Sequence, residues 1–89
     1  MVLQDEIKTA VEKSMDLMVS QTTSYIPFLK IAFPHVRDLS EFVFNMMIGN
    51  ALTVFFTQFS MRMQSPLESD FADFGKIVEP YRNKIKELF

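Results

Sequence analysis

The sequence predicts an all-α fold, a small helical bundle of three long helices plus a short Pro-bounded helix. Two observations lead to this fold class. Apolar residues recur at three- and four-residue steps along most of the chain, which is the periodicity of amphipathic helices. Helix-start signals and prolines divide this pattern into segments. With 89 residues the chain is long enough for one domain, so residues 1–89 are expected to form a single helical domain.

The first helix is predicted from Val2 to about Thr22. Acidic residues lead its first turn, where the helix dipole favours negative charge. The polar run from Ser20 to Ser24 is expected to end it. Its apolar positions are Leu3, Ile7, Ala10, Val11, Met15 and Met18.

A short helix is predicted from about Pro27 to Ala32, between two prolines. Pro27 suits the first turn of a helix, because a first-turn N–H has no partner within the helix. Pro34 cannot lie within an undisturbed helix, so it limits this segment on the other side. An irregular apolar connector is the alternative.

The central helix is predicted from Asp38 to about Gln64. Asp38 and Glu41 have the spacing of a capping box, in which an acceptor at the N-cap is followed three residues later by Glu. The segment from Phe42 to Met61 then carries no charge.

The last helix is predicted to begin at a second start signal, with Ser65 at the N-cap, Pro66 at the first helical position and Glu68 two residues later. Gly75 weakens this helix, and Pro80 is expected to kink or divide it. Beyond Pro80 an apolar face resumes and continues to the end of the chain.

The uncharged central segment is about as long as a membrane span, which needs roughly 20 apolar residues. Its two Asn and one Gln are a heavy polar load for a lone span. Basic residues flank it on both sides, so the charge asymmetry that orients a span is missing. A membrane span is therefore disfavoured, and the segment is interpreted as the central helix of a soluble bundle.

One side of this central helix is the candidate partner contact. On a helical projection, small and polar residues gather on one side, and three large apolar residues intrude there. Small residues let another helix approach closely, whether it belongs to the same chain or to a second copy. The candidate contact residues are Phe42, Met46, Gly49, Thr53, Phe56 and Thr57.

Catalytic, metal-binding and cofactor-binding residues are not predicted. The chain has no Cys, and a lone histidine, His35, does not provide the three or four ligands of a usual metal site. Acidic residues near the start of the last helix need no role beyond the helix dipole. The two glycines are too few for a phosphate-binding loop. The net charge of −2 without a basic block disfavours nucleic-acid binding. The expectation is a protein that is not an enzyme.

The function expected from these features is a non-catalytic helical module for protein–protein interaction or oligomerisation, with a homodimer as the simplest assembly. The alternative is a binder of an apolar or lipid-like ligand, or of a peripheral membrane surface. Exposed apolar residues on the central helix would favour the first interpretation, whereas an enclosed cavity lined by Phe and Met would favour the second. A cytoplasmic location is expected, because neither Cys nor a targeting signal is present.

Overall fold

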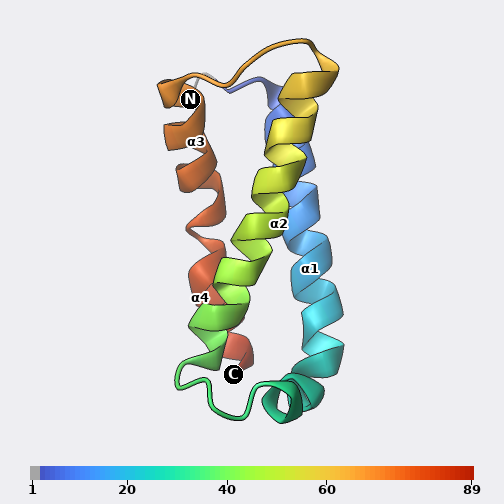
Figure 1. Cartoon of the computed structure of the whole chain (residues 1–89), viewed down its shortest axis with the longest axis vertical. Helices are drawn as coiled ribbons and strands as arrows, with labels where there is room; N and C mark the ends of the chain where they lie inside the picture. Colours follow the sequence, from blue (N-terminus) through green and yellow to red (C-terminus); the bar gives the residue numbers. More distant parts are fainter. Residues whose placement is uncertain (1–2) are drawn as a thin grey trace.

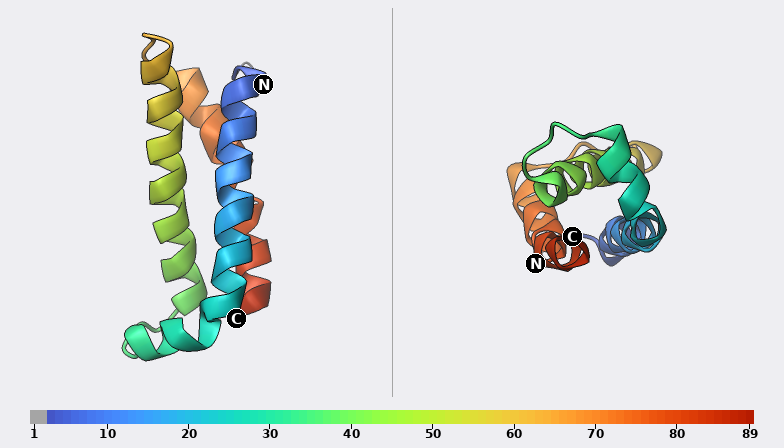
Figure 2. Two further views of the ribbon diagram at one scale, coloured as in Figure 1. Left: turned by 90° about the vertical axis from the view of Figure 1, so that its right-hand side faces the viewer. Right: turned by 90° about the horizontal axis from the view of Figure 1, so that it is seen from below.

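The computed structural model describes residues 3–89, and in that part of the chain it contains helices and no strand. The helices are α1 (Asp5–Ala32), α2 (Leu39–Met61), α3 (Glu68–Val78) and α4 (Tyr81–Leu88). Helices α1 and α2 lie side by side, and α3 and α4 follow one another along them (Figure 1). Viewed end-on, α1, α2 and the α3–α4 pair form the three corners of a triangle (Figure 2). The predicted all-α small bundle is confirmed.

Helix α1 is longer than the sequence predicts, because it continues through Pro27 to Ala32. The predicted end between Ser20 and Ser24 is therefore wrong, and the segment from Pro27 to Ala32 is the last part of α1. Val2 lies outside the described residues, but Leu3 and Gln4 are not helical, so the predicted start is also wrong and α1 begins at Asp5 with Gln4 at the N-cap. Proline has no N–H for the carbonyl four residues earlier, and such a gap bends a helix. The last turns of α1 accordingly change direction and lie across one end of the bundle (Figure 2).

Helix α2 begins where the sequence predicts. The Asp38 carboxylate accepts a hydrogen bond from the backbone N–H of Glu41 at 3.2 Å, which is the expected N-cap contact. The Ser40 hydroxyl donates to the same Asp38 oxygen at 2.8 Å. The Glu41 carboxylate forms an ion pair with Arg82 of α4. The start signal thus also joins α2 to α4.

Helix α2 ends at Met61, three residues before the predicted end at Gln64, in a Schellman motif. The Gln64 N–H donates to the Phe59 carbonyl and the Met63 N–H donates to the Ser60 carbonyl, both at 3.0 Å. Met63 adopts the left-handed conformation that this motif requires, with φ of 53°. Its side chain is 97% exposed, so no packing offsets the cost of this conformation.

Substitution of Met63 by Gly is expected to raise the free energy of unfolding by about 1 kcal/mol, because Gly adopts the left-handed conformation without steric cost. Urea unfolding followed by circular dichroism measures the change. Met61→Gly is the matched control, since Met61 is also exposed but lies inside the helix. In that control the free energy of unfolding is expected to fall by about 0.5–1 kcal/mol. Equal effects of the two substitutions would contradict the assignment of strain to Met63.

Helix α3 begins two residues later than the predicted first turn. Leu67 rather than Ser65 is at the N-cap, and the Asp70 carboxylate accepts the Leu67 N–H at 2.8 Å. The observed cap thus uses a carboxylate within the first turn of the helix, where the helix dipole also favours negative charge, instead of the Ser65 hydroxyl. The predicted division at Pro80 is confirmed, since α3 ends at Val78 and α4 begins at Tyr81.

The core lies along the inner faces of all four helices. In α1 the buried residues recur every four positions, as the sequence predicts. The buried side of α2 faces α1 and α4. In the C-terminal half of α2, aromatic rings of α2 meet aromatic rings of α3. The buried apolar residues are Leu3, Ile7, Val11, Met15, Val43, Phe44, Met47, Ala51, Phe55, Phe59, Phe74, Ile77, Val78, Tyr81 and Ile85.

Candidate functional site

Five of the six predicted contact residues lie on one exposed side of α2. We call Met46, Gly49, Thr53, Phe56 and Thr57 the exposed α2 face. Met46 is 52% exposed and Phe56 is 43% exposed, although both are large apolar side chains. Their separations of three, four and seven residues place these five positions on the same side of a helix. The other helices of the chain leave this face largely uncovered.

Phe42, the sixth predicted contact residue, is placed differently. It is half-buried and packs against the buried core. Its ring lies 4.9 Å from the ring of Phe33, which belongs to the connection between α1 and α2. Phe42 therefore helps to fix that connection, and the larger part of its side chain is already in contact within the chain.

The polar groups of the exposed α2 face are satisfied within the helix. The Thr53 hydroxyl donates to the Gly49 carbonyl at 3.2 Å, and the Thr57 hydroxyl donates to the Thr53 carbonyl at 2.9 Å. A Cβ atom added at Gly49 would meet nothing within 4 Å. A second helix placed here would bury no unpaired hydroxyl, and it would meet no side chain at Gly49.

Phe71 of α3 extends this face, and the sequence analysis missed it. Phe71 keeps the helical spacing of the apolar residues of the last helix, but it is 44% exposed, and Leu67 at the N-cap is 68% exposed. The Phe71 ring lies 6.0 Å from that of Phe56, edge to face, and 5.4 Å from that of Phe55. Spacing alone did not distinguish Phe71 from the buried Phe74, because residues three apart share one side of a helix. The result is an apolar surface that crosses from α2 to α3.

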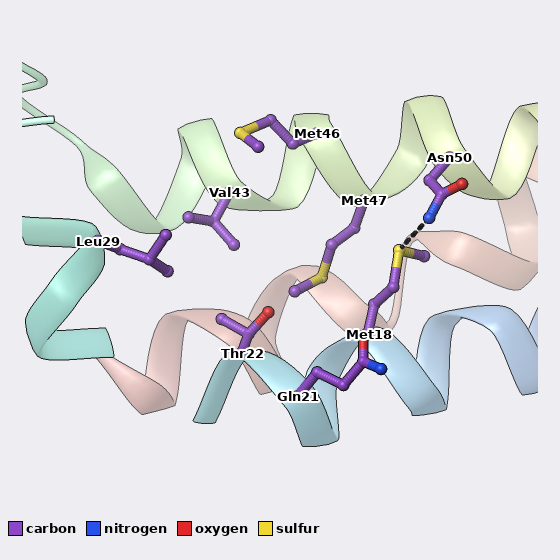
Figure 3. A pocket seen from close by; sticks show the side chains of 8 residues that line it. All are labelled: Met18, Gln21, Thr22, Leu29, Val43, Met46, Met47 and Asn50. Atoms are coloured by element: carbon purple, nitrogen blue, oxygen red, sulfur yellow. Dashed lines mark hydrogen bonds between the residues drawn. The ribbon is translucent and has the colours of Figure 1, made fainter. Parts of the chain in front are cut away.

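A groove of about 330 Å³ lies between α1 and α2 on the inner side of the α1 bend (Figure 3). Three Met side chains line it, and the Asn50 amide donates to the Met18 sulfur at 3.0 Å across it. Its lining is therefore flexible and mainly apolar. Unlike the enclosed cavity expected for a ligand carrier, it has exposed residues at its rim and no Phe. The lining residues are Met18, Gln21, Thr22, Leu29, Val43, Met46, Met47 and Asn50.

The acidic residues of α3 serve the fold. Asp70 accepts the Leu67 N–H, as described above, and Asp73 is buried and accepts the backbone N–H of Leu3 at 3.1 Å. His35 is exposed in the connection between α1 and α2. Within residues 3–89, no three His, Cys, Asp or Glu side chains are grouped as metal ligands.

Arg82, a basic residue of α4, is also held by neighbours within the bundle. Arg82 lies 4.4 Å above the Phe44 ring and donates to Glu79 at 2.8 Å, in addition to its ion pair with Glu41. Its guanidinium thus combines a cation–π contact with two carboxylate contacts. Arg82 is consequently a link between α2 and α4 rather than a free cation.

By length and composition alone, α2 is the one helix in the described part of the chain that could cross a membrane. In the bundle, 28% of its most apolar 18-residue window is buried. Much of the apolar surface of α2 therefore points away from the core of its own chain.

Comparison of the chain with protein-family models, with curated proteins and with solved structures found no match in any of the three.

Proposed function

We propose that this protein is a non-catalytic helical module that associates with a second copy of itself through the exposed α2 face and Phe71. The observation that carries the proposal is the exposure of Met46, Phe56 and Phe71 on neighbouring helices. Large apolar side chains left exposed together, as Phe56 and Phe71 are with their rings 6.0 Å apart, are typical of interaction sites in soluble proteins.

The total accessible surface supports this proposal. It amounts to 5960 Å² for a chain of 10.4 kDa. A folded monomer of that mass exposes about 5,400 Å² on average. The excess fits an elongated bundle, 41 × 20 × 20 Å, whose long apolar side is covered by another molecule. In a dimer of this protein, the association of two α2 faces would cover that side.

The shape of the face favours a helix as its partner. Gly49 and the two Thr residues form a low strip between the larger side chains of Met46 and Phe56. Two α2 helices packed about a two-fold axis would each place large side chains against the low strip of the other. Such an interface is self-complementary and closes after two copies. A homodimer is the assembly that this geometry supports.

An apolar ligand in the groove between α1 and α2 is the alternative function. The volume of about 330 Å³ is within the range of small-molecule sites. However, Met46 belongs to both the groove and the exposed α2 face. A dimer partner on that face would reach the rim of the groove. The groove is therefore explained at least as well as a flexible edge of the dimer interface as it is by a separate ligand pocket.

Sedimentation equilibrium at micromolar concentration tests the proposal. The wild-type protein is expected to have the mass of a dimer, and Gly49→Glu is expected to have the mass of a monomer. The substituted side chain extends into open space in the isolated chain, and Glu is a better helix former than Gly. The monomer should therefore remain folded, with a gain of about 0.5–1 kcal/mol, whereas a charge buried at the interface opposes association.

Phe28→Glu is the matched control, because Phe28 is 64% exposed but lies on the last turns of α1. This variant is expected to keep the dimer mass. A strictly monomeric wild-type protein would refute self-association. A dimer that persists in both Gly49→Glu and Phe56→Glu would place the interface elsewhere.

A further inference from the structure

We propose that the bent end of α1 docks on an anionic lipid surface through Tyr25, Phe28 and Ile31. These three side chains are 59%, 64% and 74% exposed, which makes them among the most exposed large apolar residues of the chain. They lie in the last turns of α1 and do not belong to the exposed α2 face. The proposal concerns a second surface and does not depend on the dimer.

The bend gives this segment the geometry of an interfacial helix. The last turns of α1 run across the end of the bundle, so one side of the segment faces the bundle and the other faces outward (Figure 2). Leu29, on the inner side, is half-buried against the core and lines the groove. Phe28 and Ile31 lie three residues apart on the outer side, and Tyr25, one turn before Leu29, lies at its edge with its ring beside that of Phe28. An amphipathic helix at a membrane lies in the plane of the surface in this way, with its apolar side in the lipid.

The composition of the exposed set suits the boundary between lipid and water. The Tyr25 and Phe28 rings lie 6.3 Å apart and tilted, so they form one aromatic patch. Tyr has an apolar ring and a polar hydroxyl, and such side chains are common at membrane interfaces. Ile31 adds an aliphatic side chain beside this patch. A water-soluble surface without a partner would keep little of this area exposed.

Charge favours an anionic lipid over a neutral surface. All 11 acidic residues of the chain lie outside residues 17–37, whereas Lys30 and Arg37 lie inside that segment and are exposed. Helix α4 ends at the same end of the bundle, and its last turns carry Lys84 and Lys86 together with Glu87 (Figure 1). Asp38, the nearest acid along the chain, accepts the N-cap hydrogen bond of α2 and lies outside this segment. Residues 17–37 thus carry two positive charges and no negative side chain in a protein with a net charge of −2.

A symmetric contact between two copies of the chain explains these features less well than a lipid surface does. A second copy of the chain would meet this basic end with an equally basic end if the two ends associated symmetrically. A lipid surface containing phosphatidylserine presents the opposite charge, and each basic residue near it adds to binding. Apolar insertion and charge attraction then act on the same few turns of α1.

Co-sedimentation with vesicles tests the proposal. The full-length protein is mixed with vesicles of phosphatidylcholine alone or of phosphatidylcholine with phosphatidylserine. Binding to the anionic vesicles is expected, with weaker binding at high salt and to neutral vesicles. Phe28→Glu is expected to lower the partition coefficient about tenfold or more, because it removes one inserted ring and adds a charge. Lys30→Glu keeps the apolar patch and is expected to lower it about fivefold or more.

Gly49→Glu is the control, because it changes the exposed α2 face and leaves the end of α1 intact. It is expected to bind anionic vesicles far more tightly than Phe28→Glu does. Circular dichroism shows whether each variant retains its helices. The proposal is overturned if the wild-type protein does not sediment with anionic vesicles, or if Phe28→Glu binds them as well as the wild type. It is also overturned if Phe28→Glu changes the mass of the protein alone, which would make the α1 end a protein contact.

Discussion

Phe55→Ala is expected to lower the free energy of unfolding by about 3–5 kcal/mol, the range for a fully buried Phe. Phe55 is completely buried, and four other Phe rings lie within 6 Å of its ring centre. All four have tilted or edge-to-face contacts, two of which join α2 to α3 and two of which continue along α2, so the cavity cannot be filled by one neighbour. For 89 residues the total stability is on the order of 4–13 kcal/mol. The loss expected for Phe55→Ala is therefore a large share of the total free energy of unfolding.

Urea unfolding followed by far-ultraviolet circular dichroism measures this loss. Phe28→Ala is the matched control, since it deletes the same ring from a position that is 64% exposed. That control is expected to change the free energy of unfolding by less than about 1 kcal/mol. If the two substitutions had similar effects, the aromatic cluster around Phe55 would not make a special contribution to stability.

The parts of the fold that the sequence predicts are those with a local chemical cause. Asp38 begins α2 because its carboxylate bonds an N–H three residues later, and that contact depends on nothing distant. Pro80 divides the last helix because its ring and missing N–H act on the adjacent turns. Such signals can be found without knowledge of the packing.

Pro27 is the opposite case. A proline inside a helix costs about 3 kcal/mol locally, so the sequence favours a break. In the structure Leu29 packs against the core beyond the bend, and Phe33 packs against Phe42 of α2. These contacts come from residues distant along the chain, and they hold the turns after Pro27 in helical form. Local propensity could not reveal them.

The candidate site likewise has one part that follows from local sequence and another that depends on packing between helices. The exposed α2 face was predictable because Gly49, Thr53 and Thr57 mark the side of the helix that the core does not need. Phe42 lies on that side, but the path of the α1–α2 connection brings Phe33 onto it. Phe71 joined the face because it lies at the edge of the buried side of α3, where Phe74 is covered and Phe71 is 44% exposed. Both differences arise from how the helices meet, which periodicity within one helix does not contain.

Two separate surfaces then follow from one sequence. The exposed α2 face runs along the side of the bundle, and the bent end of α1 crosses its tip (Figure 2). A dimer formed along the side would present two bent α1 ends. If these ends point the same way, both reach one lipid surface. The two proposals are thus compatible, although each is tested separately.

The last prediction concerns alkaline pH and Tyr81, which is buried between α4 and α1. The Tyr81 hydroxyl donates to the Asp16 carboxylate at 2.7 Å and lies 3.4 Å from the Glu12 carbonyl. Burial of the ring raises the pKa of Tyr81 well above its ordinary value of 10.0, and the hydrogen bond to Asp16 and the negative charges of Asp16 and Glu12 raise it further. The folded protein therefore holds the phenol proton more tightly than the unfolded chain does.

Because the pKa of Tyr81 is higher in the folded state, its contribution to stability is fully present below about pH 10 and is lost as the pH rises above that value. The loss should reach about 1.4 kcal/mol per pH unit from this one group. Tyr81→Phe is expected to lower stability by about 1–2 kcal/mol at neutral pH, since it removes a hydrogen bond to a carboxylate, and to abolish this part of the alkaline loss. Urea unfolding of both proteins from neutral pH to above pH 10 gives the difference directly. Tyr25→Phe is the control, because Tyr25 is 59% exposed, and it should keep the alkaline slope of the wild type. An unchanged slope in Tyr81→Phe would mean that other groups cause the alkaline loss and that the contact between Tyr81 and Asp16 does not control it.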